Sequence, residues 1–94
     1  MPLHLSIDKA ANIVGSQTKL AQMLDIYPTH LSNMKAGTRP CTINTRVRIA
    51  EIAGDDPQRA IIEGLIAQLD KDDQRQAGAA AMLQSMLDAF PPES

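Results

Sequence analysis

Thr29, Ser32 and Asn33 are the side chains of this 94-residue chain best suited to a specific chemical task. They lie three and four positions apart, so they share one face if this stretch is helical. An asparagine amide pairs with adenine through two hydrogen bonds, and a hydroxyl can contact either a donor or an acceptor on a base edge. Three such side chains on one helix face can contact base edges in the major groove of double-stranded DNA. The base-reading candidates are Thr29, Ser32, Asn33, His30 and Lys35.

Other chemistries find little support in the sequence. His4 and His30 have no cysteine or carboxylate cluster around them, whereas zinc normally takes three or four ligands. Cys41 has no histidine near it in sequence, so it is described better as a small loop residue than as a catalytic thiol. The pairs Asp55-Asp56 and Asp72-Asp73 stand at expected helix starts, where carboxylates cap the helix. We therefore expect neither an enzyme nor a bound metal or cofactor.

Periodicity and end signals predict an all-α chain. The hydrophobic residues make up 44% of the sequence, and Tyr27 and Phe90 are the only aromatics among them. Ser6 and Ser16 are expected to cap the first two helices, and glycines to end several of them. In the second helix, Leu20, Ala21, Met23 and Leu24 are expected to form one buried face. The expected helices are 7–14, one beginning after Ser16, Pro28 to Gly37, 44 or 45 to Gly54, about 57–69, and 74–90.

A fixed spacing of small and apolar residues predicts a helix-turn-helix over 17–37. Two helices that cross steeply need a small residue where they touch, and Ala21 supplies it. The apolar positions around it fit inward-facing sites on two helices joined by a turn of three or four residues. These positions are Leu20, Leu24, Ile26, Leu31 and Met34.

The stretch from Leu20 to Pro40 resembles the helix-turn-helix of lambda-repressor/Cro-type regulators, above all in Leu31-Ser32-Asn33-Met34 and Ala36-Gly37-Thr38-Arg39-Pro40. The resemblance covers residues 4–69 and implies the five-helix DNA-binding domain of that family, with Gln17 at a phosphate. It extends to short prophage-encoded regulators.

Three positions depart from the family pattern. Asp25 stands where a turn glycine is usual, and aspartate adopts the left-handed backbone more easily than most residues. Tyr27 replaces the usual serine or threonine cap, and Pro28 replaces a glutamine that often contacts a base. Proline suits the first position of a helix, so the fold survives these changes. Because the usual glutamine contact is lost, however, the operator sequence cannot be copied from a member of that family.

The charge of the chain is unevenly divided. Residues 1–48 carry a net charge of +4, whereas residues 49–94 carry −6. The basic half suits a phosphate-facing surface, although a solvated face is the alternative. The candidates for phosphate contacts are Gln17, Thr18, Lys19, Arg39, Arg46 and Arg48.

Residues 1–69 are predicted to form the DNA-binding domain, and 70–94 a charged hinge followed by an Ala/Met-rich helix or a partly disordered tail. A domain this small buries too little surface for strong specificity, so we expect a homodimer on a palindromic operator. The dimer could use the fifth helix, the C-terminal stripe, or both. The interface candidates are Ile62, Leu65, Ile66, Leu69, Met82, Met86 and Phe90.

We therefore expect a transcriptional regulator, either a prophage-type repressor or a Cro-like switch, with double-stranded DNA as its partner. The alternative is an anti-repressor or antitoxin that reads no DNA and binds a protein through its acidic C-terminal segment. A single cysteine fits a reducing compartment, and we see neither a secretory signal nor an apolar run of about 20 residues. A cytoplasmic location without membrane contact is the expectation.

Overall fold

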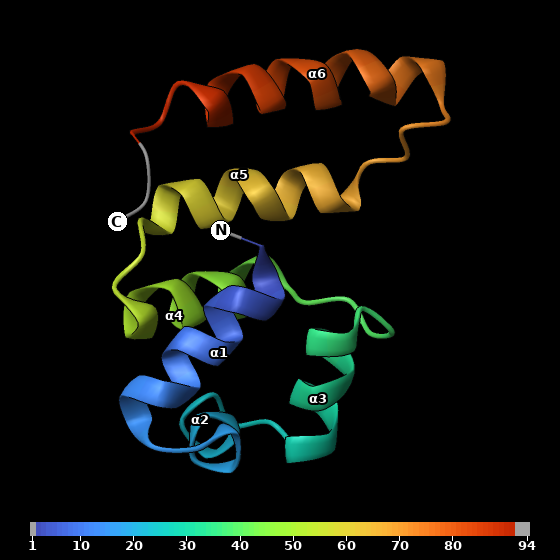
Figure 1. Cartoon of the computed structure of the whole chain (residues 1–94). Helices are drawn as coiled ribbons and strands as arrows, with labels where there is room; N and C mark the ends of the chain where they lie inside the picture. The colour runs from blue at the N-terminus through green and yellow to red at the C-terminus, as the bar shows by residue number, and fades with distance from the viewer. Residues whose placement is uncertain (1, 92–94) are drawn as a thin grey trace.

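The computed structural model describes residues 2–91, which form six α-helices and no strand (Figure 1). The predicted all-α class is confirmed. Residue 1 and residues 92–94, the last part of the predicted tail, lie outside the described residues. The helices are α1 Leu3–Val14, α2 Gln17–Met23, α3 Pro28–Ala36, α4 Ile43–Ala53, α5 Pro57–Gln68 and α6 Gln74–Asp88.

Most helix ends lie where the sequence signals predicted them. Ser16 caps α2, its Oγ accepting a hydrogen bond of 3.0 Å from the Lys19 backbone N–H. Asp56 and Asp73 cap α5 and α6 through their carboxylates in the same way. Three helices end at a left-handed residue, with φ of 115°, 82° and 77° at Gly15, Gly37 and Gly54. Glycine adopts this conformation without steric cost.

The predicted start of the first helix is wrong. α1 begins at Leu3, so Ser6 lies inside the helix and is buried instead of capping it. Leu3 packs against the core, and this contact favours extending the helix by one turn. The Ser6 hydroxyl donates to Oδ2 of Asp55 at 3.4 Å. A tertiary contact has thus replaced the local capping role.

Smaller differences occur in three other helices. α4 begins at Ile43 because Thr42 caps it, its Oγ1 accepting from the Thr45 backbone N–H at 3.2 Å. α6 ends at Asp88, two residues before its predicted end. In α2, Met23 is 47% exposed and does not belong to the buried face. The buried residues of this seven-residue helix are Leu20 and Ala21.

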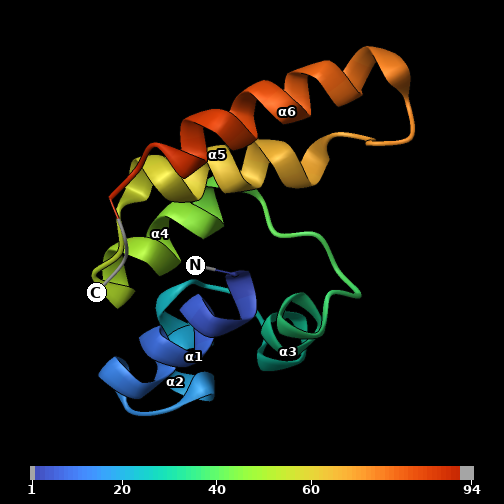
Figure 2. The ribbon, with the colours of Figure 1, turned by 45° about the horizontal axis from the view of Figure 1, so that its top comes forward.

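The helices form two groups, shown in Figures 1 and 2. α1 contacts α2, α3 and α4, and α2 contacts α3. α5 packs on α4, and α6 contacts no helix other than α5. The α5–α6 hairpin therefore covers one end of the molecule, while α2 and α3 lie toward the other end.

The core lies between α1, α2, α3 and α4. Its largest fully buried side chains are Ile7, Leu20, Leu31 and Ile49, one from each of these helices. Ala21 is fully buried, as its predicted place at the helix crossing requires. Packing in this core holds α2 and α3 against α1. The α5–α6 hairpin contributes little to it, since Ile62 and Ala80 are the buried hydrophobic residues there among those described.

Candidate nucleic-acid interface

The turn between α2 and α3 is a hydrogen-bonded helix end with aspartate in the left-handed position. Asp25 has φ 57°, and no other non-glycine residue among 2–91 has a positive φ. The Asp25 N–H donates to the Gln22 carbonyl at 3.1 Å, and the Ile26 N–H to the Ala21 carbonyl at 3.0 Å. These two bonds satisfy carbonyls at the end of α2 and reverse the chain. The expectation that Asp25 serves as the turn residue is confirmed.

α3 presents two different faces. Leu31 and Met34 are buried in the core. Thr29, Ser32 and Asn33 are exposed on the rest of the helix. Pro28 occupies the first turn, and Tyr27 caps the helix without a side-chain hydrogen bond. The three predicted polar side chains are thus placed on solvent-facing positions of one helix.

A hydrogen bond joins the start of α2 to the exposed face of α3. Nε2 of Gln17 donates to Oγ of Ser32 at 2.9 Å. This contact leaves the Ser32 hydroxyl hydrogen and the Gln17 carbonyl oxygen available to other groups. Thr18 and Lys19, next to Gln17 in α2, are exposed. The two helices therefore present one continuous polar surface with a restrained side chain at its centre.

Several basic candidates make contacts within the chain. Lys35 forms an ion pair with Asp8 of α1. Arg48 donates to the backbone carbonyls of Met23 and Leu24, at the end of α2. These bonds supply donors to carbonyls that have no partner within the helix. Arg48 thereby joins α4 to the end of α2.

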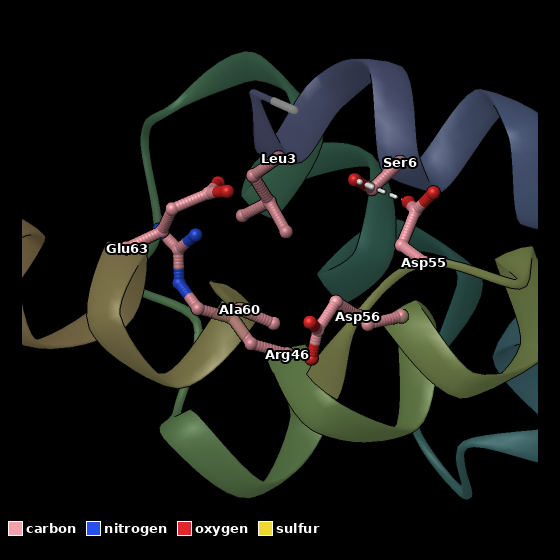
Figure 3. A pocket seen from close by; sticks show the side chains of 8 residues that line it. Leu3, Ser6, Arg46, Asp55, Asp56, Ala60 and Glu63 are labelled. Atoms are coloured by element: carbon pink, nitrogen blue, oxygen red, sulfur yellow. Dashed lines mark hydrogen bonds between the residues drawn. The ribbon is translucent and has the colours of Figure 1, made fainter. Parts of the chain in front are cut away.

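Arg46 lies in the packing between α4 and α5. Its side chain runs past Gly64, where a Cβ would come within 2.9 Å of the Arg46 Cδ. Nε of Arg46 is buried without a hydrogen-bond partner. In Figure 3 the side chain extends from α4 toward Glu63 of α5. This arrangement couples α4 to α5.

Lys19 and Arg39 remain as exposed cations near this surface. Both are exposed, and no ion pair joins either to another residue within 2–91. Arg39 follows the end of α3 in the loop before α4.

From the sequence, Tyr27 is predicted only to replace the usual serine or threonine cap of the helix. Its side chain is 80% exposed at the start of α3. It lines an open depression together with Gln22, Asp25, Ile26 and half-buried His30. The signal in the sequence that could have marked Tyr27 is its aromatic ring, since the chain has only two aromatic residues. The partner contacts of Lys35, Arg46 and Arg48 had no comparable signal in the sequence.

The cavity between α1, α4 and α5 is too small for a substrate. Its volume is about 20 Å³, and it is lined by Leu3, Ser6, Arg46, Asp55 and Glu63 among others (Figure 3). A space of this size admits about one water molecule. The part of the chain that the structure describes contains no group of three or more histidine, cysteine or acidic side chains positioned to hold a metal ion.

Cys41 is half-buried in the loop before α4. Burial raises the pKa of its thiol to about 11, although the positive charge of Arg46 opposes the rise. A thiol with this pKa is protonated at neutral pH and is a poor nucleophile.

The predicted dimer residues have different surroundings. Ile62 is buried, whereas Leu65, Ile66, Leu69 and Phe90 are half-buried. Met82 and Met86 of α6 are exposed. Across residues 2–91, none of the helices combines the length and the apolarity needed to cross a bilayer.

No family model, no curated protein and no solved structure matches this chain.

Proposed function

We propose that this chain is a sequence-specific regulator of transcription that binds double-stranded DNA. In this proposal, α1 to α5 form a lambda-repressor-like domain and α3 enters the major groove. The observation that carries it is the exposed row Thr29, Ser32 and Asn33 on a helix anchored by Leu31 and Met34. Direct reading of bases requires polar side chains on a rigid helix that fits the groove.

Each group on this surface has an expected role. The Asn33 amide pairs with an adenine, while the hydroxyls of Thr29 and Ser32 contact neighbouring base edges. His30 lies beside them. Gln17 holds Ser32 in place through the 2.9 Å hydrogen bond and contacts a phosphate with the backbone N–H groups at the start of α2.

Further residues position the helix on the DNA backbone. Lys19 and Arg39 contact phosphates on either side of the groove, assisted by Thr18. The phenol of Tyr27, at the start of α3, donates to a phosphate or sugar oxygen. Lys35 acts indirectly, because its ion pair with Asp8 ties α3 to α1. Two copies then bind two half-sites of a palindromic operator.

Selection of bound DNA from a random pool, at physiological salt, tests the proposal. We expect enrichment of a palindromic sequence. With the selected DNA, Asn33→Ala is expected to weaken binding by about tenfold or more, since one bidentate base contact contributes about 1–3 kcal/mol. The matched control is Asn12→Ala, which removes an exposed asparagine from α1. Absence of enrichment, or equal affinities of the two variants, overturns the proposal.

A further inference from the structure

A cleft with a volume of about 310 Å³ lies between the end of α3 and α5, next to the start of α1. α3 contacts α1 and α2 but not α5, so packing does not fill the space between them (Figures 1 and 2). Pockets that hold small molecules have volumes of about 300–1,000 Å³. This space, which we call the α3–α5 cleft, is therefore large enough for a small ligand, whereas the cavity in Figure 3 is not.

The charged side chains that line the α3–α5 cleft are all basic. They are Lys35, Arg39 and Arg46, and His4 lines the cleft beside them. None of the described residues along its walls is an aspartate or a glutamate, although the chain as a whole carries a net charge of −2. A cleft lined by charges of one sign raises the local concentration of ions of the opposite sign. The α3–α5 cleft therefore favours an anion.

The three cations differ in how freely they can bind a ligand. Lys35 already pairs with Asp8, which lies outside the cleft lining. Arg46 is packed beside Gly64 of α5. Arg39 is exposed, and no ion pair joins it to another residue within 2–91. A guanidinium can bind a carboxylate through two parallel hydrogen bonds. Arg39 is thus the residue that can hold an anionic group, with the other two cations behind it.

The charge of Arg46 acts on the wall of the cleft. Cys41 is another lining residue, and it lies on the loop that follows α3. Burial raises the pKa of its thiol, while the positive charge of Arg46 opposes that rise because it favours the thiolate. A negative group of a ligand in the cleft is stabilised by the same charge.

Apolar side chains make up much of the remaining wall. Met34 is buried, Leu3 is half-buried, and Pro40 and Ala67 are exposed at the cleft. An inorganic ion gains nothing from such surfaces, whereas an apolar group is removed from water when it covers them. Binding pockets commonly combine apolar walls with a few polar groups that orient the ligand. The walls therefore favour an anion that carries an apolar body.

We propose that the α3–α5 cleft binds a small organic carboxylate, with the carboxylate on Arg39 and the apolar body against Leu3 and Met34. One acidic group fits better than several, because Lys35 is already neutralised by Asp8. The bound molecule contacts α3 and α5, which do not contact one another in its absence. Because it binds the folded chain and not the unfolded chain, it raises the melting temperature.

Binding of the carboxylate does not depend on DNA. The two activities are linked where the proposed function holds, since Arg39 is also the proposed partner of a DNA phosphate. One guanidinium does not serve both anions fully at once. A saturating carboxylate is therefore expected to weaken binding of the selected DNA, by a factor no larger than that of Arg39→Gln.

A titration followed by ¹H–¹⁵N NMR, with the full chain at low salt and without DNA, tests the proposal. Sodium hexanoate and sodium benzoate are the probes, and hexan-1-ol and inorganic phosphate are the comparisons. We expect at least one carboxylate to shift the amide signals of Gly37, Cys41 and Gly64, with a dissociation constant of about 1 mM or below. The signal of Gly78 in α6, which does not line the cleft, should stay in place. Hexan-1-ol and phosphate should bind more weakly, because each lacks one half of the ligand.

Two variants and their matched controls locate the site. Arg39→Gln should raise the dissociation constant of the bound carboxylate by about fivefold or more. Arg75→Gln removes the same charge from a side chain that is 91% exposed on α6, and it should leave the constant unchanged. Ala67→Phe fills the cleft from α5 and should abolish binding, whereas Ala79→Phe, at an exposed position of α6, should not.

Three results overturn the proposal. They are the absence of shifts at the cleft with both carboxylates, equal binding of phosphate and of the carboxylates, and equal effects of Arg39→Gln and Arg75→Gln. A chain that binds the carboxylate in the cleft but selects no DNA sequence overturns the proposed function alone.

Discussion

Asp55 joins α1 to the junction of α4 and α5. Its carboxylate accepts hydrogen bonds from Nζ of Lys9 at 2.9 Å and from the Ser6 hydroxyl at 3.4 Å, and its side chain is 8% exposed. Asp55→Ala leaves both donors without this partner. We expect the free energy of unfolding to fall by about 1–3 kcal/mol, the usual cost of removing one partner of a buried polar contact.

Urea denaturation checks the prediction for Asp55. Asp72→Ala is the control, because Asp72 is exposed in the segment between α5 and α6 and such positions change stability by about 0.5 kcal/mol or less. Equal midpoints for the two variants would show that the Lys9–Asp55 contact does not stabilise the fold.

Cys41 gives the chain a defined response to alkaline pH. Burial raises the thiol pKa from 9.0 to about 11, so the folded state holds this proton more tightly than the unfolded state does. The contribution of the buried thiol is fully present below pH 9 and is lost as pH rises through about 11. At pH 8, alkylation of the native thiol should be about a hundredfold slower than alkylation in urea, since a pKa difference of two units lowers the thiolate fraction by that factor.

Iodoacetamide labelling followed by mass spectrometry measures the two alkylation rates. Cys41→Ala is the control for stability, and it should lose less stability than the natural chain between pH 9 and 11. Equal labelling rates in the native and unfolded states would contradict a buried, protonated thiol.

At the scale of the helices, local signals predicted much of the structure. The glycines at 15, 37 and 54, the cap at Ser16 and the left-handed turn at Asp25 are all dictated by backbone chemistry within a few residues. The start of α1 was missed because it depends on packing of Leu3 against a distant core. Local chemistry alone therefore predicts helix ends better when no long-range contact competes.

The same distinction applies to the candidate site. Exposure of Thr29, Ser32 and Asn33 follows from helical spacing and was predicted. The partners of Arg46 and Arg48 depend on how α4 crosses its neighbours, and an arginine in a sequence gives no sign of them. The exposed polar face of α3 could therefore be predicted from the sequence. Which basic side chains make no contacts within the chain could not.

Two helical glycines should respond in opposite directions to the same substitution. Gly78 of α6 has no atom within 4 Å of an added Cβ, so Gly78→Ala is expected to raise the free energy of unfolding by about 0.5–1 kcal/mol through helix propensity. At Gly64 of α5, the Cβ would approach the Arg46 Cδ at 2.9 Å and the Ile43 Cγ1 at 3.2 Å. Gly64→Ala should therefore lower stability, because α4 and α5 must separate.

Thermal unfolding of both variants measures these two effects. A parallel rise of both melting temperatures would mean that Arg46 adjusts freely and does not fix the distance between α4 and α5.

At the scale of the whole molecule, charge is divided along the chain. The acidic half contains α5 and α6, and the basic half contains α2 and α3. Most acidic residues of that half lie in the segments that lead into α5 and α6, namely Asp55, Asp56, Asp70, Asp72 and Asp73. The two helices lie at the end of the molecule away from α2 and α3 (Figure 1). Such a division favours one orientation of approach to a polyanion.

The salt dependence of DNA binding follows from the exposed cations. If Lys19 and Arg39 each neutralise one phosphate, log K should fall with log salt at a slope of about −1.8 for each bound copy. Lys19→Ala and Arg39→Ala should each make this slope less steep by about 0.9. Arg46→Ala should lower the melting temperature but keep the slope, because its side chain lies between α4 and α5. Fluorescence anisotropy over a salt series measures all three. A slope that Arg46→Ala reduces as much as Lys19→Ala does would return Arg46 to the phosphate surface.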